Sequence, residues 1–285
     1  MTERNNEDRI AELPAEPTTK TTEPLAPVVV IQETGLNFVS PTEYVALPSR
    51  GKFYPEGHPL KNKGDVEIRY MTAKEEDILV SKTLLKKGIA LERMLENLIV
   101  DKTIKVDDLI LGDKNAMFVA ARISGYGSAY ETEVTCPNCL TKSKSVFNLS
   151  EIKETVLPEV LNETGRGTFL ISLPRTKVDV EVRLLLGKDE RELQEQQENR
   201  VKTKQGENRT TSQMKKITVA VDGHTERKVI DSFIDRLPAS DARVLREEYR
   251  KITPDLDMKQ TFECAKCNFD EEIEVPLTVD FFWPK

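Results

Sequence analysis

The sequence predicts an α+β protein in which a helical N-terminal unit and a mixed α/β middle unit are joined by a split pair of Cys-x-x-Cys β-hairpins. Three observations support this class. Apolar and polar residues alternate over short runs such as 65–70 and 178–186, which is typical of half-buried strands. Other runs, such as 91–99, repeat apolar residues at helical spacing. The four cysteines form two pairs of identical spacing that lie far apart in the sequence.

The cysteine pairs predict a metal site. They are Cys136 with Cys139 and Cys264 with Cys267. Two residues between the thiols let one tight turn direct both sulfurs at one ion, and two such turns complete a tetrahedral zinc site. Strand-like residues follow each pair, so the hairpins should resemble a zinc ribbon divided by an insertion. Iron suits the same four thiols. Redox Cys-x-x-Cys pairs usually begin a helix, and structural disulfides need an oxidising compartment; neither context is indicated here.

Composition and charge narrow the function. Hydrophobic residues make up 38% of the 285 residues and charged residues 32%, so we expect part of the chain to be unpacked. The net charge of −7 argues against a general nucleic-acid binder. Neither a signal peptide nor a membrane-spanning run is evident, and we therefore expect a soluble protein made in a reducing cytoplasm.

Residues 1–43 hold several prolines among Thr, Glu and Lys, which predicts a disordered tail. The helical unit should span 44–128. Within it we expect a strand at 65–70 and a helix that begins at the capping box Thr72-Ala73-Lys74-Glu75 and ends at Gly88.

Two more helices should complete this unit. The first has an apolar stripe of Leu91, Met94, Leu95, Leu98 and Ile99. The second should be capped by Asp113 and end at Gly125.

Three segments follow. A hairpin that carries the first Cys-x-x-Cys turn, here called the first knuckle hairpin, should span 129–150. An inserted α/β unit should span 151–256, and the second knuckle hairpin, with the second Cys-x-x-Cys turn and an aromatic C-terminus, should span 257–285. The inserted unit should contain a β-hairpin at 169–186, a solvated helix that becomes a mobile loop over 188–212, a short strand at 217–221 ending in an Asp-Gly turn, and helices at 226–236 and 240–252.

Two features of the knuckle hairpins are the residue after each second cysteine and the charged residues beside the turns. Zinc knuckles commonly place Gly after the second Cys, where the backbone is left-handed, but Leu140 and Asn268 occupy these positions. Asn tolerates this conformation more readily than Leu. If the hairpins lie side by side, Lys142 and Lys144 should face the acidic run 270–274.

The chain ends with three consecutive aromatic residues, Phe281, Phe282 and Trp283. Free termini are normally mobile and polar, so this cluster should act as an anchor. It either closes the core of this chain or docks into a neighbouring subunit, since aromatic residues are favoured at interface cores.

No catalytic motif is evident. The two histidines, His58 and His224, lie in turn-like contexts, and neither a nucleophile elbow nor a Gly-rich phosphate loop is present. We therefore predict that the chain is not an enzyme. A structural or assembly protein and a zinc-ribbon adaptor for nucleic acid or protein are the two remaining classes; Lys142 and Lys144 favour the adaptor, whereas the acidic run 270–274 opposes it.

Several stretches carry a family resemblance. The run Val45-Ala46-Leu47-Pro48-Ser49-Arg50-Gly51-Lys52-Phe53-Tyr54-Pro55-Glu56-Gly57-His58-Pro59-Leu60 resembles the opening motif of a baseplate protein family of contractile-tailed, T-even-type phages. Residues 71–79, 109–115 and 281–284 are also similar to that family, and the likeness extends from about Tyr44 to the end of the chain.

This resemblance implies a non-enzymatic component of the baseplate hub, or a factor that assembles it. Its partners would be other baseplate, hub or tail proteins, with no nucleic acid, membrane insertion or small-molecule substrate. The protein would occupy the host cytoplasm during assembly and the virion tail baseplate if retained.

Overall fold

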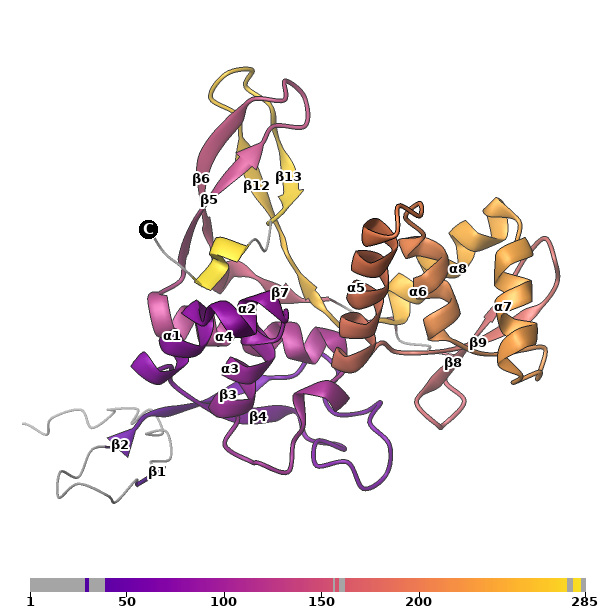
Figure 1. The fold of residues 1–285 in the computed structure, drawn as a ribbon, viewed down its shortest axis with the longest axis horizontal. Helices are drawn as coiled ribbons and strands as arrows, with labels where there is room; N and C mark the ends of the chain where they lie inside the picture. Colours follow the sequence, from indigo (N-terminus) through magenta and orange to yellow (C-terminus); the bar gives the residue numbers. More distant parts are fainter. Residues whose placement is uncertain (1–28, 31–38, 156, 159–161, 276–278, 283–285) are drawn as a thin grey trace, which may run out of the picture.

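The computed structural model describes residues 29–30, 39–155, 157–158, 162–275 and 279–282. In this part of the chain, eight α-helices combine with small antiparallel sheets, which confirms a mixed α/β architecture (Figure 1). None of the helices in the described ranges is both long and apolar enough to cross a membrane.

The first part of the chain is a β-hairpin followed by helices. Its elements are β3 (Thr42–Ala46), β4 (Asp65–Arg69), α1 (Ala73–Val80), α2 (Lys82–Lys86), α3 (Ala90–Leu98), the 3-10 turn η1 (Val106–Asp108) and α4 (Leu111–Tyr126). Val66 and Ile68 of β4 are buried, as the alternating sequence predicts.

Helix α1 begins where the capping box predicts. The carboxylate of Glu75 accepts hydrogen bonds from the amide of Thr72 at 3.0 Å and from its hydroxyl at 2.8 Å. However, the predicted helix up to Gly88 is divided in two, because Ser81 is extended (ψ 106°) and separates α1 from α2. Gly88 follows α2 with a φ of +67° and is the predicted stop.

The stripe of α3 is confirmed except at Leu91, which is exposed. The prediction for Asp113 is wrong. Helix α4 begins at Leu111, so Asp113 is its third residue, and its carboxylate is fully buried as an acceptor for groups of a distant loop. The helix also passes Gly125 and ends before Gly127, whose φ is +83°.

Two further hairpins carry the cysteines. The first consists of β5 (Ala129–Thr135) and β6 (Lys142–Asn148), and the second of β12 (Lys259–Glu263) and β13 (Asp270–Glu274). Figure 1 shows them side by side, projecting from the body of the molecule.

The middle of the chain contains a three-stranded antiparallel sheet in the order β10-β9-β8, flanked by helices. Its elements are β8 (Thr168–Ser172), β9 (Asp179–Arg183), α5 (Gly187–Lys202), α6 (Arg209–Ile217), β10 (Thr218–Val221), α7 (Arg227–Arg236) and α8 (Ala239–Ile252). The predicted hairpin and both late helices are therefore confirmed. Asp222 and Gly223 form the predicted turn, each with a positive φ.

Residues 188–212 do not end as a loop. Helix α5 continues to Lys202, and α6 starts at Arg209 after a short connection. Met214 and Ile217, just beyond this segment, are buried and hold one side of α6 in the core. The following strand begins at Thr218, so Ile217 belongs to the helix.

Four short elements complete the described chain. They are the pair β1 (Val29–Val30) and β2 (Val39–Ser40), the pair β7 (Lys153–Glu154) and β11 (Leu256–Asp257), and the 3-10 turns η2 (Leu149–Glu151) and η3 (Val279–Phe282). Most of the predicted disordered tail, 1–28 and 31–38, lies outside the described residues.

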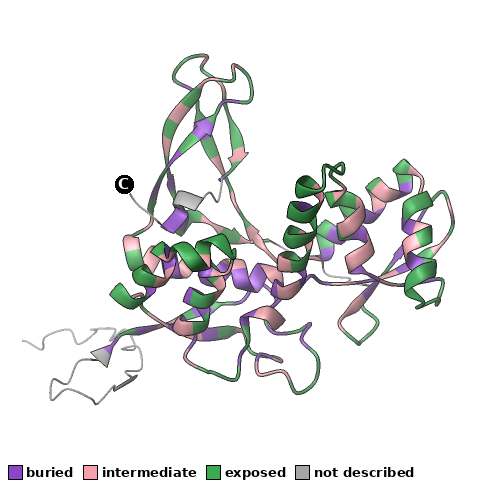
Figure 2. Ribbon diagram, in the orientation of Figure 1, coloured by how far each residue is buried: buried purple, intermediate pink, exposed green. Residues whose placement is uncertain are grey.

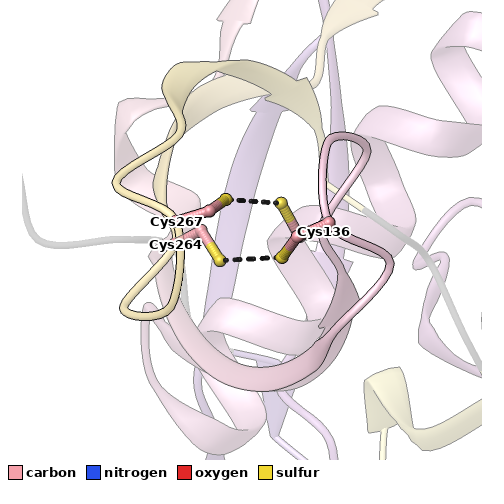
Figure 3. Close-up of side chains that lie close together, drawn as sticks. Cys136, Cys264 and Cys267 are labelled. Atoms are coloured by element: carbon pink, nitrogen blue, oxygen red, sulfur yellow. Dashed lines mark hydrogen bonds between the residues drawn. The ribbon is translucent and has the colours of Figure 1, made fainter.

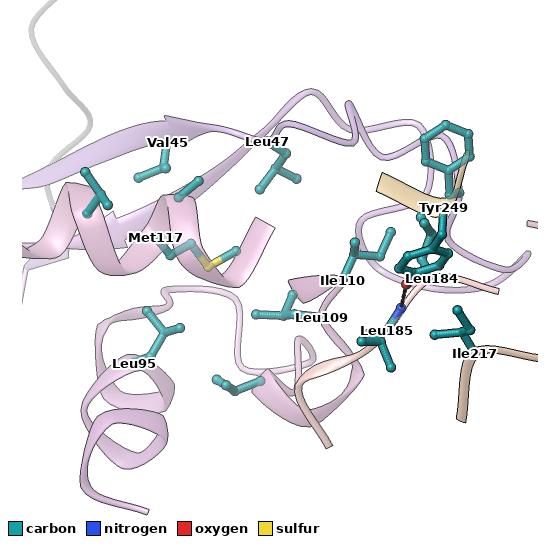
Figure 4. Close-up of a cluster of buried hydrophobic side chains, with 14 of the residues drawn as sticks. Val45, Leu47, Leu95, Leu109, Ile110, Met117, Leu184, Leu185, Ile217 and Tyr249 are labelled. Atoms are coloured by element: carbon teal, nitrogen blue, oxygen red, sulfur yellow. Dashed lines mark hydrogen bonds between the residues drawn. The ribbon is translucent and has the colours of Figure 1, made fainter. Parts of the chain in front are cut away.

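Buried side chains from most of these elements form one hydrophobic cluster (Figure 2). Figure 4 shows its centre, where Leu109 and Ile110 lie near Leu184 and Leu185. The hydroxyl of Tyr249 accepts a hydrogen bond of 3.0 Å from the amide of Leu185, which joins α8 to this centre. The projecting hairpins thus stand on a continuous core.

Candidate metal centre

Each cysteine pair lies in the turn of its hairpin. The first thiol follows β5 or β12 directly, and the second lies on the turn that leads into β6 or β13. Alternation along the strands directs Val134 and Phe262 inward beneath the turns, and both are buried. The apolar residue two positions before each pair therefore packs beneath its turn.

The two turns have the same backbone geometry. In the first, the amide of Cys136 donates to the carbonyl of Thr141 at 2.9 Å, and the amide of Leu140 donates to the carbonyl of Cys136 at 3.0 Å. Cys264 makes the equivalent bond with Phe269 at 2.8 Å. The residue after each second cysteine is left-handed, with a φ of 57° at Leu140 and 50° at Asn268.

Leu140 therefore adopts a conformation that favours Gly, Asn or Asp, and its side chain is exposed. Because this apolar side chain buries little surface there, packing does not explain the residue. The strained backbone is held instead by the hydrogen bonds of the turn.

The hairpins bring all four thiols together (Figure 3). The sulfurs of Cys136, Cys139, Cys264 and Cys267 all lie within 4.8 Å of one another. Cys136 and Cys267 are 3.7 Å apart, as are Cys139 and Cys264. A tetrahedron with zinc–sulfur bonds of about 2.3 Å has sulfur–sulfur edges of about 3.8 Å. The two distances of 3.7 Å are close to this edge, so the cluster is compatible with a metal ion such as zinc. A disulfide would bring two sulfurs to about 2.05 Å.

The surroundings of three thiols shift their pKa values in different directions. Hydrogen bonds from the side chain and amide of Thr141 lower the pKa of Cys139 to about 6. Amides of Lys266 and Cys267 lower the pKa of Cys264, whereas burial and neighbouring thiols raise that of Cys267 to about 11. Four thiolates this close repel one another, so a bound cation is needed for all of them to ionise.

The predicted electrostatic contact between the hairpins is wrong. Lys142 pairs with Glu133 at 3.0 Å and Lys144 with Glu131 at 2.6 Å, both within the first hairpin. The cause is the register of β5 and β6, which puts these lysines and glutamates on one exposed face, so that each lysine reaches the diagonal glutamate on the facing strand.

The aromatic C-terminus is partly described. Phe281 and Phe282 are buried in the core of this chain. The ring of Phe281 packs edge-on against Tyr130 at 5.1 Å, and that of Phe282 against Phe118 at 6.2 Å. Trp283 lies outside the described residues, so its docking role stays a prediction.

The two histidines have different surroundings. His58 stacks on Tyr54 with ring centroids 4.2 Å apart, and its Nδ1 accepts a hydrogen bond from the amide of Leu60. His224 is exposed in the turn after β10, with Glu226 at 4.0 Å. His58 thus has a packing role, and His224 is a surface residue.

The sequence pattern did not indicate a buried polar cluster around the carboxylate of Asp113. Ser49 donates to the carboxylate of Asp113 through its amide at 2.9 Å and through its hydroxyl at 2.5 Å, and Tyr54 donates its hydroxyl proton at 2.8 Å. Burial raises the pKa of Asp113, and these hydrogen bonds oppose that effect only in part. Both ends of this cluster lie in stretches that carry the family resemblance.

Comparison with known protein families identifies a relationship. A family described as "T4 bacteriophage base plate protein" matches residues 42–283, which is most of the chain. Searches of curated proteins and of solved structures found no match.

Proposed function

Because the chain belongs to the T4 bacteriophage base plate protein family, we propose that it is a non-enzymatic structural or assembly component of the baseplate hub region, stabilised by zinc bound to four cysteines. The observation that carries the proposal is the convergence of Cys136, Cys139, Cys264 and Cys267 at the ends of two hairpins within a chain that matches this family over residues 42–283.

The zinc would stabilise the fold by holding the two cysteine hairpins together. The hairpins project from the body, and two hydrogen bonds, at 3.0 and 2.7 Å, join Asn148 of the first to Gln260 of the second. Four thiolates on one ion would contribute folding free energy that these contacts do not supply. A closed set of four protein ligands leaves no open position for a substrate, which is the usual form of a structural zinc site.

The partners would be other proteins of the tail. Family membership implies a location in the virion tail and contact with further baseplate proteins. Assembly would take place in the host cytoplasm, and the proposal includes both a resident subunit and a factor that leaves after assembly.

The alternative of a nucleic-acid adaptor has less support. Lys142 and Lys144, the basic residues beside the first turn, are paired with glutamates, and the second hairpin presents Asp270, Glu271 and Glu272 as exposed side chains. A surface that binds phosphates needs several free cations near the turns, and the two turns between the cysteines hold the single basic residue Lys266.

The proposal is tested by locating the chain and measuring its metal. Mass spectrometry of purified phage particles and of infected-cell lysate should detect the chain in baseplates or in baseplate intermediates. Isolation from infected cells in complexes that contain no tail proteins would contradict the proposal. Metal analysis of the same purified protein should give one zinc ion per chain.

A further inference from the structure

Two strands of the chain carry nearly the same sequence. Asp-Val-Glu-Ile-Arg forms β4 and Asp-Val-Glu-Val-Arg forms β9, with the same alternation of exposed and buried side chains. Each pairs with a preceding strand, β3 or β8, that begins at Thr and is followed by Leu-Pro. In both hairpins this Thr donates a hydrogen bond to the Glu of the facing strand, Thr42 to Glu67 and Thr168 to Glu181.

The arginine that ends each strand makes the same contacts. Arg69 binds both carboxylate oxygens of Glu75, at 2.9 and 2.6 Å, and Arg183 binds both oxygens of Asp189, at 2.6 and 2.9 Å. Each acid also accepts a hydrogen bond of 3.0 Å from the amide three residues before it, at the start of the next helix. A bidentate arginine thus fastens strand to helix twice in the chain.

The next elements also correspond. Helices α3 and α6 have the same length. The residue after each helix bridges back to the strand, Ile99 to Ile68 in the first case and Thr218 to Val182 in the second. The bridge at Ile99 therefore stands in the N-terminal unit where β10 pairs with β9 in the middle unit. The three-stranded sheet corresponds there to two strands, β3 and β4, and one bridge.

A buried aspartate recurs near the start of α4 and α8. Asp113 accepts from the amide of Ser49, and Asp241 accepts from the amides of Arg175 and Thr176 at 3.1 and 2.8 Å. Ser49 and Arg175 each follow Leu-Pro directly. Both aspartates are fully buried, so each carboxylate holds the loop of its own hairpin to a later helix.

The knuckle hairpins complete the series. Twenty-three positions separate Asp113 from Cys136, and the same number separates Asp241 from Cys264. The strand registers also agree, since the residue before each first cysteine faces the residue three positions after its second cysteine.

We propose that the chain is a tandem duplication of one structural unit, residues 42–148 and 168–274, and that the metal centre lies where equivalent parts of the two copies meet. The equivalent hydrogen bonds occur in the same order along both segments, which a chance likeness of β-hairpins does not explain. Residues 151–256, predicted as an insertion, then belong largely to the second copy. The copies differ in two places. The loop that contains Leu-Pro is long in the first copy (47–64) and short in the second (173–178), and the second copy has an additional helix, α7, where the first has only the turn η1.

The thiol geometry agrees with this arrangement. Cys136 corresponds to Cys264 and Cys139 to Cys267, and each close sulfur pair joins the first cysteine of one copy to the second cysteine of the other. Exchange of the copies therefore leaves the two 3.7 Å contacts unchanged, as a local two-fold axis requires. Each copy supplies half of the site. This last step rests on the metal site proposed above, whereas the duplication does not.

The bodies of the copies meet differently. Arg191 of the second copy binds Asp107 of the first at 2.6 and 2.7 Å, and the amide of Leu111 donates to the carbonyl of Leu185 at 3.0 Å. Among the described residues, neither contact recurs between the equivalent positions when the two copies are exchanged. Equivalent surfaces of the two copies thus meet at the ends of the hairpins.

The duplication is tested in the full-length protein by removing equivalent arginines. Hydrogen exchange measured by mass spectrometry should show about ten-fold faster exchange over 65–75 in Arg69→Ala, and over 179–189 in Arg183→Ala, with the other segment unchanged. Arg93→Ala is the control, because this exposed residue forms an ion pair with Glu96 of its own helix. If the alanine variants do not fold, Arg69→Lys and Arg183→Lys keep the charge but lose the bidentate contact, and should show smaller changes at the same two segments.

The half-site arrangement is tested by exchanging the turns. A full-length variant with P137A, N138K and L140N in the first turn and A265P, K266N and N268L in the second should still bind one Co²⁺ per chain with an unchanged absorption spectrum. The control is C139A with L140C, which keeps four thiols but alters their spacing and should lose the metal.

The outcomes separate the two ideas. Unequal responses of the two arginine sites, with one variant indistinguishable from wild type, overturn the duplication. Loss of Co²⁺ by a folded exchange variant overturns the half-site arrangement. Absence of metal from the wild-type protein overturns the proposed metal site but leaves the arginine test unaffected.

Discussion

Arg122 donates a hydrogen bond of 2.7 Å from Nε to the carbonyl oxygen of Phe281, although 159 residues separate them. The same guanidinium donates to the carbonyls of Gly127 at 2.8 Å and Ala129 at 3.2 Å. One buried arginine thus joins the end of α4, the start of the first knuckle hairpin and the C-terminal turn.

Loss of this contact should expose the role of the aromatic C-terminus. Deletion of 281–285 removes two buried rings and leaves Arg122 short of one acceptor, so we expect a large loss of stability. The single change Phe281→Ala should lower the free energy of unfolding by about 3–5 kcal/mol. Urea denaturation followed by circular dichroism measures both effects.

Deletion of 283–285 is the matched control, because it keeps both buried rings. If Trp283 docks to a partner, this shorter deletion should fold normally but fail to join baseplate intermediates. A loss of stability as large as that of the 281–285 deletion would contradict our assignment of the core role to Phe281 and Phe282.

Cys264→Ser should release the metal. Removal of one thiolate opens the set of four, and metal content measured by elemental mass spectrometry should fall from one ion per chain to well below one. Lys266→Ala, in the same turn, keeps every thiol and should keep the metal. The hairpins should lose protection from hydrogen exchange in the Cys264→Ser variant, while α3 and α4 retain theirs.

Tyr54→Phe should destabilise the fold through the buried carboxylate of Asp113. The hydroxyl donates to Asp113 and accepts from the amide of Ile110 at 3.1 Å, so its removal leaves buried groups unpaired. We expect a loss of about 1–3 kcal/mol in the free energy of unfolding. Tyr44→Phe, at an exposed position, should change stability little. Equal midpoints for the two variants in urea would show that the buried cluster contributes nothing.

Stability should fall in acid through Glu75. Burial opposes ionisation of this carboxyl, but hydrogen bonds from Arg69 and Thr72 outweigh burial, and its pKa lies below the ordinary value. A group with a lowered pKa stabilises the fold above its unfolded pKa of about 4.3, and the effect disappears as pH falls through the folded value. The urea midpoints of wild type and Glu75→Gln should therefore converge below about pH 4.

Asp113 should show the opposite pH dependence to Glu75, because its pKa is raised by burial. Its contribution is present below the unfolded pKa and is lost as pH rises through the folded one. The gap between wild type and Asp113→Asn should thus widen in acid, where the gap for Glu75→Gln closes. Parallel behaviour of the two variants would refute this assignment.

Reversal of Lys142 and Lys144 to Glu should cost little stability. Both side chains are exposed, and exposed ion pairs contribute little. The new like-charge pairs with Glu133 and Glu131 lie within one hairpin, so the thermal midpoint should fall slightly and recover in high salt. Release of the metal by this variant would show that these lysines influence the thiol cluster.

Much of the fold could be predicted from local pattern. Alternation located β4, β8 and β9, and the capping box located the start of α1, because both signals depend on neighbours within a few residues. The Cys-x-x-Cys spacing likewise indicated the turn, since two thiols on one turn are a local arrangement.

The internal repeat was also present in the sequence, as Asp-Val-Glu-x-Arg at 65–69 and 179–183. It was missed because loops of different length change the spacing between corresponding residues, so no constant period runs along the chain. The hydrogen bonds of Arg69 and Arg183 reveal the correspondence, since equivalent atoms meet whatever the length of the loop between them.

The sequence alone thus determined most strands and helices and both thiol turns, because each depends on residues that are close along the chain. It did not reveal the break at Ser81 or the start of α6 at Arg209. Only the tertiary structure decided which distant groups meet. It brought Cys136 to Cys267, directed Asp113 to Ser49, and paired Lys144 with Glu131 in place of the acidic run 270–274. Such contacts depend on strand register and on packing across more than one element, and a side chain's polarity does not specify its partner.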